Sequence, residues 1–318
     1  GDRLLIDKLT LALRPPRRWE VVVFRCPRRA SQYCIKRIVG LPGETVQIVK
    51  GEVLVNGRRV RKSLSQFRKM AILVHDTRFR HGAQRQRPWP WQATGETGWR
   101  STGAGFRYVP DASRQTPEKT RQVEWLEFQY RSGSPAKPPD AGPILVSDDY
   151  GYNQSLSRPL QEVNDLLLVC RVKVSGAGEL YLRAATADRL FEARLQPAAG
   201  SGQLYADGNL VDQLVDREPF LGGPQLLEWT TIDGTCRLVV DGRLLLGYTP
   251  AERAGDARRR GTTAVATGKT AEPVAVSSLW PLGIGAVNVE VETANLQVYR
   301  DVYYTKLRTA AGRDRVKA

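Results

Sequence analysis

Asparagine–glycine and aspartate–glycine pairs recur along this chain, and they constrain its fold more than any other feature of the sequence. They stand at Asn56-Gly57, Asp207-Gly208, Asp233-Gly234 and Asp241-Gly242. Both residues of such a pair tolerate the positive φ angles of a type I′ turn, the two-residue connection of a β-hairpin. The sequence therefore predicts an all-β protein made of short antiparallel strands.

The first 62 residues are expected to be strands almost throughout. Apolar and β-branched runs bounded by Gly, Pro and Asn mark them. They cover 3–8, 19–25, 33–39, 44–50 and 52–62, with Asn56-Gly57 at a hairpin tip. No helix of three or more turns is expected within 19–62.

The character of the sequence changes around residues 63–70, and short alternating strands follow from Ala71 to about Thr305. Val172 and Val174 alternate with Arg171 and Lys173. Further along, 287–291 alternate in the same way, and 296–298 continue the pattern after a break. Period-2 alternation over many short strands indicates sheets with one face in water, and hence a β-sandwich.

Lys36 stands near the middle of an apolar, β-branched strand that ends in Gly40-Leu41-Pro42-Gly43. In an apolar site, burial disfavours the ammonium form of a lysine, and the neutral amine can then act as a general base. The alternative is an ordinary edge-strand lysine that points into water. The residues around it decide between the two.

Residues 33–46 resemble the type I signal peptidases, which are membrane-bound serine/lysine proteases of peptidase family S26. That family carries a segment of the form Ile-Lys-Arg-x-Val-Gly-Leu-Pro-Gly-(Asp/Glu)-x-Val, and positions 35–46 match it almost throughout. A second family segment is similar to residues 1–8 and 16–24, in the same order and spacing. The resemblance covers residues 1–62.

The resemblance implies that Lys36 is the general base of a Ser/Lys dyad that removes signal peptides from exported proteins. The family's serine and membrane anchor precede the Gly1-Asp2 pair, so we expect both upstream of Gly1 and expect residues 1–318 alone to be inactive. Cys34 and Ile35 would bind the substrate by lining a shallow pocket for small side chains.

The family also has a closing segment that supports the lysine. Arg37 would pair with an acid of that segment, and Asp2 or Glu44 could substitute for it. The nearest candidate is residues 148–158, which lack the family's central serine and aspartate. A turn rich in Asp, Gly and Asn explains these residues better, and the resemblance then places the closing segment beyond Ala318.

The second region resembles a concanavalin/laminin-G type sandwich. Residues 238–245 are similar to that fold's Val-Asp-Gly hairpin, and 284–304 resemble its last strands. The expected organisation is a partial signal-peptidase-type β domain at 1–66, an antiparallel sandwich insert at 67–306, and a linker at 307–318.

The net charge of +15 is concentrated in the first region. Residues 1–69 hold 17 Lys and Arg against 5 Asp and Glu, which is +12, and the remainder holds 31 against 28, which is +3. Nucleic-acid binding would require stacking aromatics or a recognition helix, so we expect no nucleic-acid partner. An anionic membrane surface accounts for the same charge, and the resemblance implies the outer, periplasmic face of the cytoplasmic membrane.

No metal or cofactor is expected. The four cysteines (26, 34, 170 and 236) are widely spaced with no Cys-x-x-Cys pair, so isolated buried thiols are the default. His75 and His81 are the only histidines, and a metal site there is improbable.

Several aromatic residues of the second region admit two interpretations. Trp89, Trp91, Trp99, Phe106 and Trp125 could form a sugar-binding platform, but core filling is favoured. Trp89 and Trp91, which lie beside prolines, are expected to be the exposed pair. The alternative to an enzyme is thus a catalytically inactive binding protein whose sandwich recognises a glycan or protein ligand.

Overall fold

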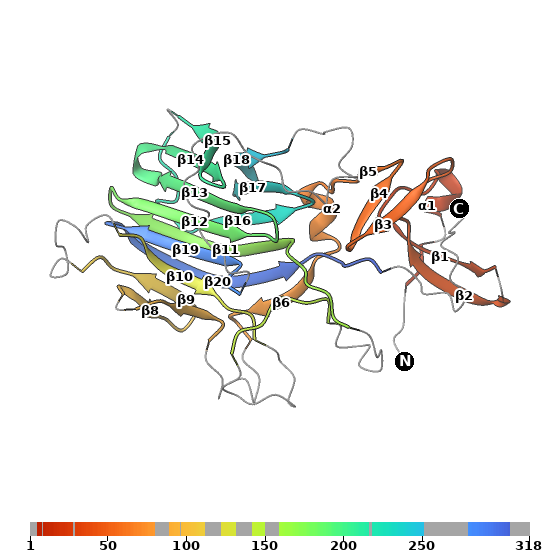
Figure 1. Ribbon diagram of the computed structural model, residues 1–318, viewed down its shortest axis with the longest axis horizontal. Helices are drawn as coiled ribbons and strands as arrows, with labels where there is room; N and C mark the ends of the chain where they lie inside the picture. The colour runs from red at the N-terminus through yellow and green to blue at the C-terminus, as the bar shows by residue number, and fades with distance from the viewer. Residues whose placement is uncertain are drawn as a thin grey trace, which may run out of the picture. The chain divides into compact units, whose positions relative to one another are not determined.

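The computed structural model describes residues 5–7, 9–27, 29–79, 89–95, 97–111, 122–131, 142–149, 159–215, 218–250 and 279–305. The chain divides into two compact units. The first comprises Gly1–Lys69, Arg253–Thr263 and Tyr303–Ala318, and the second comprises Met70–Glu252 and Ala264–Val302. Figure 1 labels their helices and strands.

The first unit is built from two small antiparallel sheets. One pairs β1 (Val21–Cys26) with β2 (Arg29–Arg37), and the other has the order β3 (Val46–Val49), β4 (Glu52–Val55), β5 (Arg58–Arg59). Two short helices, α1 (Thr10–Leu13) and α2 (Leu64–Arg68), flank them. The predicted strand at 3–8 is wrong over its described residues 5–7, which are not strand.

All four predicted Asn/Asp-Gly turns are confirmed. Asn56 and Gly57 have φ angles of 50° and 78°, and the three aspartate–glycine pairs likewise have positive φ at both residues. They connect β4 to β5, β14 to β15, β16 to β17 and β17 to β18. Turn chemistry that is readable from single dipeptides therefore sets the hairpin registers.

The change from strand-like sequence that the sequence analysis noted around residues 63–70 coincides with the start of α2. The Ser63 hydroxyl accepts a hydrogen bond from the Gln66 backbone N–H at 3.2 Å, and the Gln66 side chain accepts one from the Ser63 N–H at 2.9 Å. This reciprocal pair is a capping box, which satisfies two of the free N–H groups at a helix start. Phe67 is the buried residue of this helix.

The second unit is a two-sheet antiparallel β-sandwich, as predicted. Its strands are β6 (Ile72–Asp76), β7 (Trp91–Ala93), β8 (Trp99–Ser101), β9 (Gly105–Tyr108), β10 (Glu124–Phe128), β11 (Leu166–Ser175), β12 (Glu179–Ala185), β13 (Leu190–Gln196), β14 (Ser201–Ala206), β15 (Asn209–Leu214), β16 (Gln225–Ile232), β17 (Thr235–Val240), β18 (Arg243–Tyr248), β19 (Leu282–Val287) and β20 (Glu290–Arg300). A 3₁₀ turn, η4 (Pro197–Ala199), joins β13 to β14.

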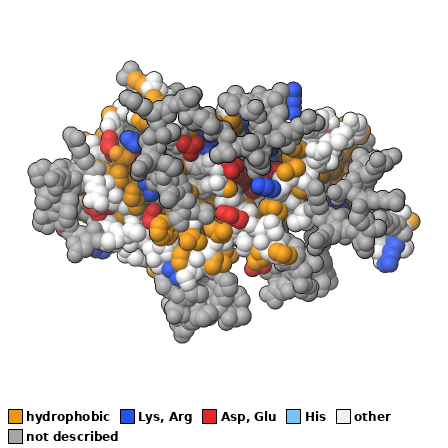
Figure 2. All heavy atoms as spheres, viewed as in Figure 1, with side chains coloured by type: hydrophobic (Ala, Val, Ile, Leu, Met, Phe, Trp, Pro, Cys, Tyr) orange, Lys and Arg blue, Asp and Glu red, His pale blue; other side chains and the backbone are white. Residues whose placement is uncertain are grey.

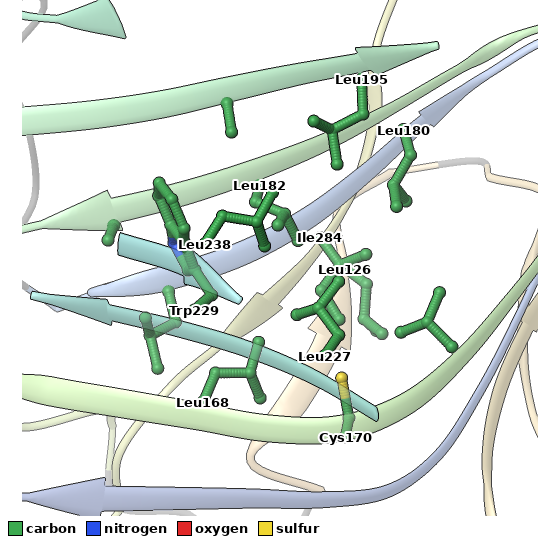
Figure 3. Packing of buried hydrophobic residues seen from close by; sticks show 14 of the residues in the cluster. Leu126, Leu168, Cys170, Leu180, Leu182, Leu195, Leu227, Trp229, Leu238 and Ile284 are labelled. Atoms are coloured by element: carbon green, nitrogen blue, oxygen red, sulfur yellow. The ribbon is translucent and has the colours of Figure 1, made fainter. Parts of the chain in front are cut away.

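The sandwich core lies between a seven-stranded and an eight-stranded sheet. The first has the order β15-β14-β13-β12-β19-β10-β7, and the second has the order β18-β17-β16-β11-β20-β9-β8, with β6 paired to β20. Figure 3 shows Leu182 and Ile284 of the first sheet in one cluster with Leu168 and Trp229 of the second. Dispersion and burial of these side chains hold the sheets together.

The alternation predicted at residues 171–174, 287–291 and 296–298 is confirmed. Val172 and Val174 are buried while Arg171 is exposed, and Val291 and Val298 are buried on β20. The break between the two halves of β20 is a bulge, because the β11–β20 register shifts there and Asn295 has a φ of 54°. An extra residue in one strand keeps both halves facing the core.

The aromatic residues divide between the two interpretations. Trp91, Trp99 and Phe106 are buried in the core. The prediction that Trp91 is exposed is wrong, because Trp91 lies on β7 and its ring packs 5.3 Å from that of Phe128. Trp125 is half-buried and lies on the outer face of the seven-stranded sheet.

Candidate functional site

Lys36 lies on β2 and is directly opposite Val22 of β1. Its neighbours in register are the pairs Phe24↔Cys34 and Val23↔Ile35. Lys36 is exposed in the structure. The apolar strand seen in the sequence therefore presents its lysine on an open two-stranded sheet.

The pleat of β2 separates the two residues that the sequence analysis placed in one pocket. Successive side chains of a strand point to opposite faces. Cys34 therefore shares a face with Lys36, whereas Ile35 shares the other face with Arg37. Among these, Cys34 and Arg37 are half-buried and Ile35 is 45% exposed.

One backbone edge of β2 has no partner strand in the part of the chain that the structure describes. The sheet contains only β1 and β2. The Ile38 N–H donates to the Glu20 carbonyl at 2.9 Å, and backbone groups alternate in direction along a strand. Ile38 and Lys36 thus direct their backbone groups toward β1, and Ile35 directs its groups toward the open edge.

An ion pair fixes the turn that follows the lysine strand. The Arg18 guanidinium donates to both Glu44 carboxylate oxygens, at 2.5 and 2.7 Å, and it also donates to the Val39 carbonyl. The Leu41 N–H donates to Glu44 at 2.7 Å. The turn itself requires Gly43, whose φ is 80°. These contacts connect the residues before β1 to the end of the Lys36 strand.

Arg37 binds a backbone carbonyl rather than an acid among the described residues. Its Nη1 donates to the Trp19 carbonyl at 2.8 Å. Glu44, named in the sequence analysis as a substitute partner, instead accepts hydrogen bonds from Arg18 at both of its carboxylate oxygens. Asp2 lies outside the described residues.

Trp19 anchors this part of the first unit. It is buried, has a φ of 73°, and donates its N–H to the Ile38 carbonyl at 2.7 Å. Its ring lies 6.0 Å from that of Tyr304, and the Lys62 ammonium lies 5.2 Å from its centroid. Trp19 therefore joins the start of β1 to residues late in the chain.

Two carboxylates near the site are held strongly ionised. The hydrogen bond from Arg18, aided by the Leu41 N–H, lowers the pKa of Glu44. The hydrogen bonds from the Arg14 side chain and the Arg17 N–H lower the pKa of Glu20 to about 2. Both arginine partners keep their charge at any ordinary pH, so the pairs persist through the neutral range.

Exposed apolar side chains gather in the first unit, over α1 and the β1–β2 sheet. They are Leu5, Ile6, Leu9, Leu11, Leu13, Val21, Phe24, Tyr33 and Ile35. On the sheet, Val21, Tyr33 and Ile35 share one face and Phe24 lies on the other. Among the residues described, no helix combines the length and apolarity that crossing a bilayer requires.

In the second unit, a polar and aromatic surface lies on the outer face of the seven-stranded sheet. The Arg183 guanidinium stacks 3.8 Å from the Trp125 ring centroid and faces Glu127 and Glu192 at 3.7 and 3.6 Å. The Trp125 ring covers Gly283 and Gly285 of β19, where an added Cβ would lie 3.1 and 3.0 Å from it. The two glycines make room for that ring.

Next to this surface is an open hollow of about 610 Å³. Its lining includes Glu179, Tyr181, Gln196 and Asn288. Glu179 accepts hydrogen bonds from Tyr181 at 2.6 Å and from Gln196 at 2.9 Å. Tyr181 is also in edge contact with Trp125, with ring centroids 6.2 Å apart. Figure 2 shows one face of the molecule, where apolar and charged side chains intermingle.

The remaining predicted site residues lie outside the β1–β2 hairpin or outside the residues that the structure describes. Asp148 and Asp149 belong to the second unit, where Asp148 accepts the Gln161 N–H at 2.8 Å, and residues 150–158 lie outside the described residues. His81 is also outside them. Within the described part of either unit alone, no three His, Cys, Asp or Glu side chains converge as metal ligands.

Sequence comparison confirms the resemblance of the N-terminal region. Residues 1–97 match the family model of signal peptidase, peptidase S26. Signal peptidase I of Leptolyngbya laminosa is 39% identical over 73 residues, which are 21% of this chain and 36% of that protein. Probable signal peptidase I-2 of Synechocystis sp. is 44% identical over 63 residues, 18% and 29% of the two chains. The chain thus spans about a third of the length of these relatives.

Among solved structures, a Bacillus subtilis protein with a galectin-like fold aligns with a TM-score of 0.39 at 8% sequence identity. The alignment covers 74% of this chain and 99% of that one.

Two features of the site were not predicted from the sequence. The first is the Arg18–Glu44 clamp, whose only signal is an arginine before β1 and a glutamate directly after the Gly-Leu-Pro-Gly turn. The second is the influence of the Cys26 side chain on Cys34, whose thiol pKa it raises, although both cysteines were expected to be isolated and buried. Both are half-buried. In each case the partners are brought together by strand pairing, which sequence spacing does not reveal.

Proposed function

We propose that this chain is part of a signal peptidase I-like serine endopeptidase, in which Lys36 is the general base. The observation that carries the proposal is the position of Lys36 on β2, a strand with an open edge, within residues 1–97 that match the signal peptidase family model. The nucleophile would be a serine of a preceding segment, as the family resemblance implies. The substrates would be signal peptides of exported preproteins.

The proposed reaction uses one amine twice. The neutral amine of Lys36 takes the proton of the serine hydroxyl while the serine oxygen attacks the scissile carbonyl carbon. The C–N bond breaks, the proton passes to the leaving amine, and an acyl-enzyme forms. Lys36 then takes a proton from water as the water oxygen attacks the acyl carbon. The ester C–O bond breaks, the proton passes to the serine oxygen, and the signal peptide leaves with a new C-terminal carboxylate.

The open edge of β2 would position the substrate. An extended peptide that adds to this edge gains main-chain hydrogen bonds to groups such as those of Ile35, and pockets for alternate side chains give specificity. Cys34 shares the face of Lys36, so it would contact the residues on either side of the scissile bond. Ile35 would contact side chains on the opposite face.

The test is processing of a preprotein by the complete gene product. We expect Lys36→Ala to abolish cleavage while circular dichroism stays unchanged. Lys36→Arg keeps a positive charge on a side chain that cannot lose its proton in water, and it should be equally inactive. Lys173→Ala, on β11 of the sandwich, is the matched control and should process normally. Normal cleavage by Lys36→Ala would refute the general-base role.

An anionic membrane surface is the second proposed partner, at the outer face of the cytoplasmic membrane. Residues 1–69 carry a net charge of +12, and exposed apolar side chains of α1 and β1–β2 lie in the same unit. Near-surface Lys and Arg each contribute about 1 kcal/mol to binding anionic lipid. Sedimentation should show binding to phosphatidylglycerol vesicles that weakens with salt, and Leu9→Ser/Leu13→Ser should reduce it.

A glycan-binding role for the sandwich is the alternative that one specific surface favours. Trp125, Tyr181 and the polar hollow beside them offer an aromatic ring next to carboxylate and amide groups. Such groups bind the faces and hydroxyls of sugars. A panel of immobilised oligosaccharides should retain the wild-type chain and release Trp125→Ala. If the wild-type chain binds no oligosaccharide, the glycan-binding role is refuted. If Lys36→Ala also abolishes cleavage, only the peptidase proposal is supported.

A further inference from the structure

Two cysteines of the first unit are placed as a pair by the β1–β2 hairpin. Cys34 is opposite Phe24, and Cys26 ends β1 two residues later. The pairing shifts register between Arg25 and Cys26, so that Cys26 pairs with Arg29. Because Cys26 lies two residues after Phe24, its side chain points to the same face of the sheet as that of Cys34. The Cys26 side chain is also the main cause of the raised pKa of the Cys34 thiol.

The other two cysteines of the chain have a different environment. Cys170 and Cys236 are 1% and 0% exposed within the sandwich core, while Cys26 and Cys34 are half-buried. Reagents in water therefore reach the hairpin pair and not the core pair. The chain thus contains its own internal control for thiol accessibility.

We propose that Cys26 and Cys34 are a modification site, at which a reversible disulfide cross-links β1 to β2 beside Lys36. This inference rests on the placement of the side chains and does not require the proposed peptidase activity. The oxidant is a disulfide, either glutathione disulfide or a dithiol–disulfide oxidoreductase.

The reaction balances as two thiol–disulfide exchanges. The thiolate of one cysteine attacks the oxidant's disulfide and displaces one thiol, which gives a mixed disulfide. The second cysteine, as its thiolate, attacks the protein sulfur of that mixed disulfide and displaces the second thiol. The protein loses two protons and two electrons, and the oxidant's sulfurs are reduced to two thiols.

The geometry is suited to this step. A disulfide requires the sulfurs to approach to about 2.05 Å. Cys26 and Cys34 lie on the same face of two paired strands, offset by two residues, and rotation about their Cα–Cβ bonds would bring the sulfurs together. The hydrogen bond with Cys26, together with burial, raises the pKa of the Cys34 thiol, and the nearby Lys36 charge partly offsets this. Formation should therefore accelerate as the pH rises above neutral.

The experiment uses the whole 318-residue chain. Purified protein is incubated with glutathione disulfide at pH 8, and free thiols are then alkylated in denaturant and counted by mass spectrometry. We expect the number of alkylated thiols to fall from four to two, with a Cys26–Cys34 peptide linkage. Dithiothreitol should restore all four. Four free thiols after oxidation, or a linkage between two chains, would overturn the proposal.

Variants separate this site from the rest of the molecule. Cys26→Ser should leave Cys34 unable to form the internal bond and should trap a glutathione adduct on it. Cys170→Ala should still lose two thiols. If Cys26→Ser does not fold, native-state alkylation of the wild type decides instead. It should modify Cys26 and Cys34 before Cys170 and Cys236, and oxidation should block it. If oxidation does not block alkylation of Cys26 and Cys34, the proposed disulfide is refuted.

Discussion

Arg18 and Glu44, 26 positions apart in the sequence, form a two-pronged ion pair with Nη2 at 2.5 and 2.7 Å from the two carboxylate oxygens. The same guanidinium binds the Val39 carbonyl, and the same carboxylate binds the Leu41 N–H. One pair therefore holds both sides of the turn after β2.

The Leu41 amide should report on the clamp. Glu44→Ala removes the acceptor of the Leu41 N–H, so hydrogen exchange of that amide should accelerate several-fold. Glu44→Gln keeps a carbonyl oxygen for Leu41 but loses the charge that Arg18 binds, so the increase should be smaller. Equal exchange in both variants and the wild type would mean that the clamp does not order the turn.

Acid should loosen the residues before β1. The pKa of Glu20 is lowered to about 2 by Arg14 and the Arg17 N–H. A carboxyl whose folded pKa lies below its unfolded value stabilises the fold above the unfolded value, near 4.5, and loses that contribution as the pH falls toward about 2. Carboxyl NMR titration should find this low pKa. Arg14→Ala should move it upward, and an unchanged midpoint in that variant would contradict the assignment.

The sandwich core should be sensitive to truncation at Leu182. This side chain is fully buried on β12, between the two sheets. Leu182→Ala should lower the free energy of unfolding by about 2–5 kcal/mol, through lost burial and the cavity left behind. Leu210→Ala, at a position 49% exposed, should change it by less than about 0.5 kcal/mol. Urea denaturation of each variant measures both, and similar costs would argue against this core.

The β17–β18 turn should require glycine at position 242 only because of the positive φ angle there, and not because a side chain would lack space. Gly242 has a φ of 80°, and a Cβ built there meets no atom within 4 Å. Gly242→Ala should therefore cost about 1–2 kcal/mol from the left-handed conformation, with no steric component. Gly223→Ala, which has neither neighbours nor positive φ, should be neutral or slightly stabilising. Thermal unfolding of the two variants separates these contributions.

Local chemistry made most of the fold predictable. Asn56-Gly57 and Asp241-Gly242 specify their hairpins through residues adjacent in sequence, and Val172 and Val174 reveal a buried face by period two. The strand expected at 3–8 is absent over its described residues 5–7, which pair with no strand of the described chain: Leu5 is fully exposed and Ile6 is 46% exposed. Trp91 was misplaced because its neighbouring prolines suggested a loop, whereas β10 recruits it into the core.

The site was less predictable than the fold. Lys36 could be singled out because a charged residue interrupts an apolar strand before a recognisable turn. The separation of Cys34 from Ile35 follows from the pleat and could have been derived. The partners of Arg37 and Glu44 could not be predicted. The sequence offers several arginines as partners for Glu44, and only the folded backbone decides which one reaches it.

The antiparallel pairing of β6 with β20 places Ile72 opposite Arg300. The chain therefore enters the sandwich and leaves it at two adjacent points, which are separated by about the width of a strand pair. Tyr304 then bridges to Gly51 within the first unit. The entry and exit of the sandwich are therefore set by this one strand pair, whatever the length of chain between Ile72 and Arg300.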